Sequence, residues 1–176
     1  MNSNLIILPG NNLVNKEWVE KARDFFASHF KSVSVQYYDH WQNGNEIIDI
    51  AVECKKLAGT FQSLKGNVTI FAKSAGTILT MYAIHTKVLN SSLIKRCVFV
   101  GLPPTWAREH DFDIDGWSTD YTVPTILLQN DHDPAASASD IQEEQAKGNF
   151  TFLELIEQKG EDHVYDDFEL IKKYLI

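Results

Sequence analysis

Ser74 stands between an apolar, β-favouring run and a run with helical character. The residues around it read Ala72-Lys73-Ser74-Ala75-Gly76, and Val68–Phe71 come directly before them. A strand that turns sharply into a helix at a serine lifts the hydroxyl clear of the sheet, and the next backbone N–H turns toward the same place. Small residues suit such a turn because strand and helix approach closely. The pattern predicts a nucleophile at Ser74, although serine is also a favoured helix N-cap.

Two polar clusters further along the chain each follow a strand-like run. Asn130–Pro134, with Asp131 and Asp133, follows one run, and Lys159–His163 follows another. The carboxyl ends of parallel strands meet at the edge of a sheet where ligands bind. A serine hydroxyl must lose its proton as it attacks, a histidine can take that proton, and an aspartate can orient and stabilise the histidine. We therefore expect a catalytic serine, acid and histidine at this edge.

Strand and helix signals alternate along the chain and predict the scaffold for these groups. Strands separated by helix-length connections imply a parallel sheet covered on both faces. We expect one domain over residues 1–176, an α/β fold built as a three-layer α/β/α sandwich around a mostly parallel six-stranded sheet. Strands are expected at Leu5–Leu8, Val33–Tyr37, Val68–Phe71, Cys97–Val100, Thr125–Leu128 and Thr151–Ile156, and helices at Lys16–Phe30, Glu46–Leu64, Gly76–Val88 and about Val164–Leu175.

With these elements in order, the chain resembles the α/β-hydrolase family over nearly its whole length. The resemblance rests on A-K-S-A-G around Ser74, P-T-I-L-L-Q-N-D-H-D-P up to Pro134, and G-E-D-H at His163. The usual motif is G-x-S-x-G, and Ala72 replaces its first glycine. The resemblance implies a compact, cap-less member with a minimal α/β-hydrolase fold. It favours Asp133 over Asp131, since the family's acid commonly precedes a proline or small residue. It also implies oxyanion-hole N–H groups at Ala75 and at Gly10 or Asn11.

The function that this resemblance implies is that of a serine hydrolase with a Ser-Asp-His triad of Ser74, Asp133 and His163. It would cleave a small ester, or a thioester or amide, through an acyl-enzyme intermediate, as a carboxylesterase does. One alternative is a catalytically silent protein of the same fold that serves as a binding module. Another is a flavodoxin-like nucleotide or flavin binder. The second alternative is disfavoured because Pro9–Asn12 lacks the Gly, Ser and Thr of a phosphate loop.

The walls of the substrate pocket are expected from two segments at the same edge. Gly101–Thr122 is the longest stretch expected to be irregular, and its Trp106 and Trp117 are candidates for a small acyl pocket. His40 and Trp41 follow the second expected strand and are candidates for the pocket wall. His40 precedes the serine, which is the wrong order for this family's base. Lys73, beside the nucleophile, is expected to be exposed in its turn.

Composition bounds the remaining possibilities. The 176 residues carry a net charge of −8, and no Lys/Arg run suggests nucleic acid as a partner. The expected partner is a small-molecule substrate; no cofactor is expected, and no residues have metal-ligand spacing. Cys54 and Cys97 are expected to be buried, reduced thiols. No apolar run approaches the length of a membrane span, and no signal-peptide pattern is present, so a cytoplasmic location is expected. The oligomeric state is left open.

Overall fold

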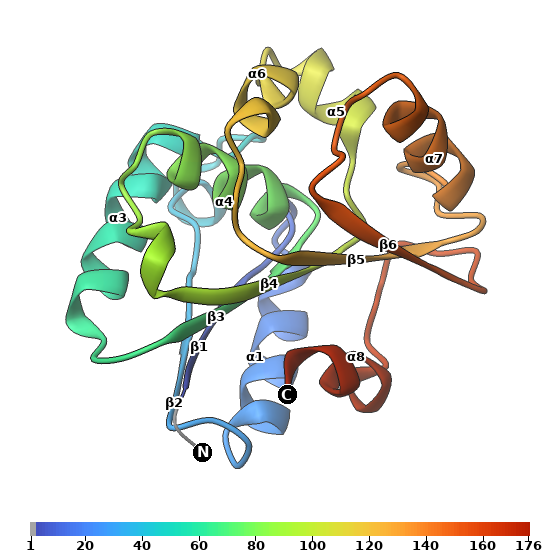
Figure 1. Ribbon diagram of the computed structural model, residues 1–176. Helices are drawn as coiled ribbons and strands as arrows, with labels where there is room; N and C mark the ends of the chain where they lie inside the picture. The colour runs from blue at the N-terminus through green and yellow to red at the C-terminus, as the bar shows by residue number, and fades with distance from the viewer. Residues whose placement is uncertain (1–2) are drawn as a thin grey trace.

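The computed structural model describes residues 3–176 and contains a six-stranded sheet with the order β2-β1-β3-β4-β5-β6. Every neighbouring pair of strands is parallel (Figure 1), so the sheet is wholly rather than mostly parallel. All six expected strands are present. Their bounds are β1 (Asn4–Leu8), β2 (Ser32–Val35), β3 (Val68–Lys73), β4 (Ile94–Val100), β5 (Thr125–Asn130) and β6 (Leu153–Gln158).

Alternation along the central strands divides the core into two layers. Leu5 and Ile7 of β1 pack with α1 (Asn15–Phe26) and α8 (Phe168–Leu175) on one face. Ile6 and Leu8 of the same strand pack on the other face. Successive side chains of a strand point to opposite faces, so a strand buried on both faces is apolar throughout. The result is the expected three-layer α/β/α sandwich.

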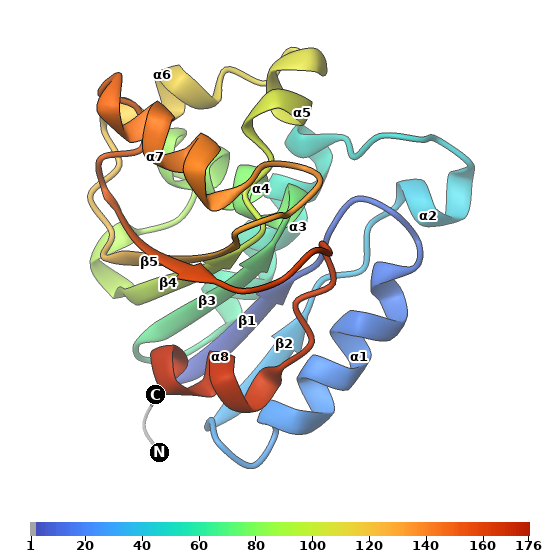
Figure 2. The same ribbon diagram turned by 90° about the vertical axis from the view of Figure 1, so that its right-hand side faces the viewer.

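The helices divide between the two faces in the way that the two core layers require. Figures 1 and 2 show α1 and α8 on one face and the remaining larger helices on the other. The second group comprises α3 (Ile50–Ser63), α4 (Ala75–His85), α5 (Pro104–Glu109), α6 (Ile114–Thr119) and α7 (Ala138–Ala146).

Several helix ends differ from the sequence-based bounds because local capping decides them. The helix expected from Glu46 begins at Ile50, where the side chain of Asp49 accepts a hydrogen bond from Val52 N–H at 3.0 Å. The last helix begins at Phe168 rather than near Val164, and Asp167 caps it. The first helix ends at Phe26 instead of Phe30.

The segment Gly101–Thr122 is not irregular, and that expectation is corrected. It contains α5, with Pro104 in its first turn, and α6, whose first turn is capped by the Asp113 side chain. These helices have six residues each, too short to give a helical repeat visible in the sequence. A further four-residue helix, α2 (His40–Asn43), ends at Gly44, whose φ of 81° is left-handed.

Candidate active site

Ser74 occupies a single-residue turn between the end of β3 and the start of α4. Its φ of 51° and ψ of −120° lie outside the regions that a serine ordinarily adopts. The turn is tight: a Cβ added to Gly76 would lie 2.5 Å from the carbonyl oxygen of Leu8. Glycine is therefore required at position 76, whereas Ala72 is accommodated with its side chain fully buried. The strained turn holds Ser74 at the carboxyl edge of the sheet, as the sequence pattern predicts.

The predicted contact between His163 and Asp133 is present. Nδ1 of His163 lies 2.8 and 2.9 Å from the two carboxylate oxygens of Asp133. Because a carboxylate only accepts hydrogen bonds, Nδ1 carries the hydrogen and Nε2 is free to act as a base. Asp131 instead stabilises the loop after β6, since its Oδ1 accepts a hydrogen bond from Gly160 N–H at 2.9 Å.

Tyr165 supports Asp133, a role that the sequence reasoning missed. Its hydroxyl donates to Oδ2 of Asp133 at 2.6 Å and accepts from Asn130 N–H at 2.9 Å. Ala135 N–H donates to Oδ1 of Asp133 at 2.8 Å. Burial alone raises the pKa of Asp133, but the hydrogen bonds from His163 and Tyr165 outweigh it and hold that pKa below its usual value. Asp133 is therefore ionised and can stabilise an imidazolium.

Gly101 lies directly against the histidine. It follows β4 with a φ of 62°, and an added Cβ would lie 2.6 Å from His163 Cε1 and 2.7 Å from Tyr165 Cε2. Any side chain here would displace the imidazole or Tyr165. The sequence offers only a glycine after a strand, which does not by itself indicate such a contact.

The loop between β1 and α1 holds the other expected oxyanion donors. The Asn11 carbonyl accepts from His40 Nε2 at 2.7 Å and from Trp41 Nε1 at 2.6 Å, and its side-chain amide donates to Glu46 O at 2.7 Å. His40 and Trp41 thus fix the loop. Within residues 3–176, the backbone N–H groups of Asn11 and Ala75 have no acceptor. Gly10 packs under Asn15, whose side chain would lie 2.8 Å from an added Cβ.

Lys73 is buried, with 6% of its surface exposed, so the expectation of an exposed turn residue is wrong. Its Nζ donates to Asn15 Oδ1 at 2.7 Å and lies 5.2 Å from the centroid of the Trp18 ring. Asn15 Nδ2 in turn donates to Asn12 O at 3.0 Å. Burial lowers the pKa of Lys73 to about 8, against the attraction of aspartates that include Asp133. Lys73 therefore links the turn at Ser74 to the β1–α1 loop.

Ser74 and His163 line one pocket of about 370 Å³, which we call the serine pocket. Asn11, Asn12 and Trp106 also line it. Within the described residues no hydrogen bond joins Ser74 to His163; such bonds are often long without substrate. A second hollow, of about 510 Å³, contains His40, Trp41 and Trp106.

Trp117 does not join these pockets. It packs in an edge-to-face arrangement on Tyr82 of α4, at a ring distance of 5.0 Å, and contacts Phe112 at 6.3 Å. Its placement therefore separates it from Trp106, which lines both hollows. The physical reason is that α6, which carries Trp117, packs on α4.

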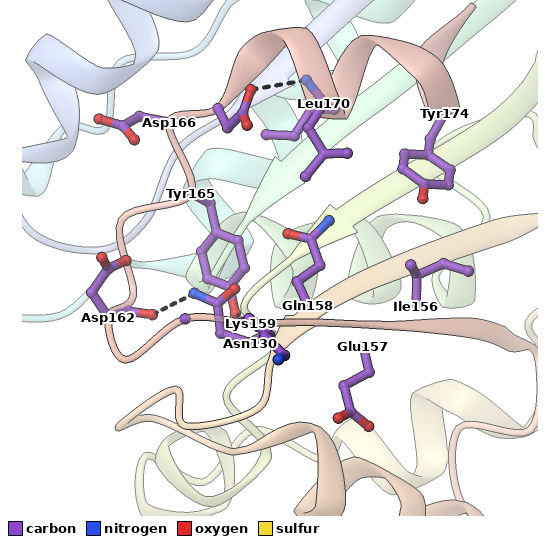
Figure 3. A pocket seen from close by; sticks show the side chains of 13 residues that line it. Asn130, Ile156, Glu157, Gln158, Lys159, Asp162, Tyr165, Asp166, Leu170 and Tyr174 are labelled. Atoms are coloured by element: carbon purple, nitrogen blue, oxygen red, sulfur yellow. Dashed lines mark hydrogen bonds between the residues drawn. The ribbon is translucent and has the colours of Figure 1, made fainter.

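A further cleft of about 410 Å³ lies between β6 and α8 (Figure 3). Asn130 and Tyr165 line it, but Ser74 and His163 do not. It therefore borders Tyr165, a hydrogen-bond partner of Asp133, and is separate from the pocket that Ser74 lines.

Other features of the described residues bear on function. No group of three or more His, Cys, Asp or Glu side chains in residues 3–176 is arranged to hold a metal ion. No helix in that range combines the length and apolar character needed to cross a membrane. Cys54 and Cys97 are free and buried, as expected.

Comparison with known proteins identifies the fold. No protein-family model and no curated protein matches the sequence. A YdeN-like hydrolase from Pectobacterium atrosepticum aligns with a TM-score of 0.67 at 16% identity, over 93% of this chain and 80% of its own. Est1E from Butyrivibrio proteoclasticus, solved with ferulic acid, has a TM-score of 0.65 at 13% identity, covering 99% and 86%. N-formylmaleamic acid deformylase from Pseudomonas putida aligns with a TM-score of 0.64 at 14% identity, over 98% of this chain and 91% of its own. With its parallel sheet and these neighbours, the chain has the α/β-hydrolase fold.

Proposed function

We propose that this protein is a serine hydrolase that cleaves a small ester, thioester or amide through an acyl-enzyme intermediate. One observation carries the proposal: a buried Asp133 carboxylate bonds to Nδ1 of His163, and His163 shares a pocket with Ser74. The structural neighbours named above are hydrolases, including a deformylase, which supports the same class of reaction. Of the three reactions, we place ester hydrolysis first. The cytoplasmic location expected from the sequence remains a prediction.

The proposed reaction assigns each group one task. Nε2 of His163 takes the proton of the Ser74 hydroxyl as its oxygen attacks the substrate carbonyl, and later returns the proton to the leaving group. Asp133 stabilises the imidazolium that forms in between. The N–H of Ala75, at the start of α4, and that of Asn11 bind the oxyanion, and each such donor is typically worth about 3 kcal/mol. Water then releases the acyl group from Ser74 by the same steps.

A fluorophosphonate probe tests the assignment, because it reacts covalently with an activated serine. We expect the parent protein to be labelled and Ser74→Ala to lose both labelling and hydrolysis of p-nitrophenyl acetate. Ser63→Ala is the matched control, since Ser63 is exposed at the end of α3. Equal labelling of the Ser74→Ala protein contradicts the proposal. An unlabelled, folded parent protein would instead favour a silent binding protein of this fold.

A further inference from the structure

We propose that the second hollow, lined by His40, Trp41 and Trp106, binds the acyl part of the substrate and selects acyl groups that carry an aromatic ring. The inference rests on the proposed hydrolase function and adds a substrate class to it. The hollow lies between the β1–α1 loop, α2 and α5, and Figure 2 shows α2 beside that loop.

The two hollows adjoin each other. Asn11, Asn12 and Trp106 line both the serine pocket and the second hollow. A substrate whose carbonyl lies at Ser74 can therefore extend across these residues into the second hollow. The serine pocket measures about 370 Å³ and the second hollow about 510 Å³, so the second hollow adds room for a larger acyl group.

The position of His163 decides which half of the substrate enters. His163 must protonate the leaving oxygen, so the leaving group lies on its side of the serine pocket, next to Pro134 and Ala135. None of these three residues lines the second hollow. The second hollow adjoins the serine pocket at Asn11, Asn12 and Trp106 and not at His163, so we assign it to the acyl half of the substrate.

The chemistry of the lining favours an uncharged aromatic ring. The Trp41 ring is fixed by its hydrogen bond to the Asn11 carbonyl, and the His40 ring stacks on Tyr38 at 5.7 Å. Rigid aromatic walls bind a planar ring better than a flexible alkyl chain, which loses more rotational freedom on binding. Glu46 is the one charged residue among those that line the hollow, and no Lys or Arg lines it to pair with an anionic acyl group.

A series of p-nitrophenyl esters with one leaving group tests this inference. We compare kcat/KM for 3-phenylpropanoate with that for nonanoate, which has the same number of carbons, and expect a preference of about tenfold for the aromatic ester, as ring packing supplies. Ile47→Trp and Asn45→Trp each fill the second hollow from a residue that makes no hydrogen bond to the Asn11 carbonyl. Both variants should lower the ratio to near one.

Val52→Trp is the control, because Val52 is exposed on α3 outside the hollow. It should retain the parent ratio. A parent without the aromatic preference, or a preference that survives in both filled variants, overturns the inference. Fluorophosphonate labelling separates this inference from the proposed hydrolase function. A labelled parent that hydrolyses acetate without the aromatic preference refutes only the acyl site. An unlabelled parent refutes the hydrolase as well.

Discussion

Replacing Lys73 by methionine should change how the stability of the protein depends on pH. Lys73 is 6% exposed, and burial lowers its pKa from 10.5 to about 8. One pKa unit corresponds to about 1.4 kcal/mol, so protonating Lys73 in the folded protein costs roughly 3 kcal/mol more than in the unfolded chain. Methionine has a similar shape, cannot be charged and removes that cost.

The sign follows from the protons bound in each state. Above the unfolded pKa of 10.5, Lys73 is neutral in both states and the cost is absent. As pH falls, the unfolded chain binds the proton first, so the parent loses stability until the folded protein is also protonated near pH 8. The variant lacks this loss. Its free energy of unfolding minus that of the parent should therefore be roughly 2–3 kcal/mol larger at pH 7 than at pH 10.

Urea denaturation of both proteins across this pH range measures that difference. Loss of the hydrogen bond from Nζ to Asn15 lowers the stability of the variant at every pH, so the change with pH is the diagnostic quantity. Lys31→Met is the control, since Lys31 is exposed, and its difference from the parent should stay flat. A flat difference for Lys73→Met as well would refute the argument that a buried charge is present.

Four further substitutions test which residues hold His163 in place. Asp133→Asn should lower kcat by about 10⁴-fold, whereas Asp131→Asn should keep most activity because that carboxylate bonds to the Gly160 loop. Ester kinetics on both variants show which aspartate is the partner of His163, and the reverse order of activities would assign that role to Asp131. Tyr165→Phe removes a hydrogen-bond donor to Asp133 and should lower the free energy of unfolding by about 1–3 kcal/mol in urea denaturation. It should also reduce kcat by a larger factor than it raises KM. Unchanged stability and kcat would show that this hydrogen bond is dispensable. Gly101→Ala should abolish most turnover by displacing His163, in a protein that remains folded by circular dichroism, and an active variant would mean that the ring has room to move.

The order of the elements, the contact between Asp133 and His163 and the position of Ser74 at the same edge of the sheet could be predicted from the sequence. Short apolar runs and the turn residues that bound them are local signals, so the six strands could be predicted, with ends displaced by a few residues. The turn at Ser74 and the polar groups after β5 and β6 are also local in the chain. Parallel pairing then brings the carboxyl ends of those strands to one edge of the sheet.

Only the tertiary structure decided how these groups are supported. Tyr165 bonds to Asp133 across a separation of 32 residues, and Gly101 touches a histidine far along the chain. Trp106 and Trp117 look equivalent in the sequence, yet one lines the serine pocket and the other packs on α4. The sequence favours an exposed Lys73 because an amine is usually solvated, and only the packing of Asn15 and Trp18 around it makes its burial possible. Local patterns fix which residues stand at a strand end, but contacts between distant segments determine which side chains are buried and what they touch.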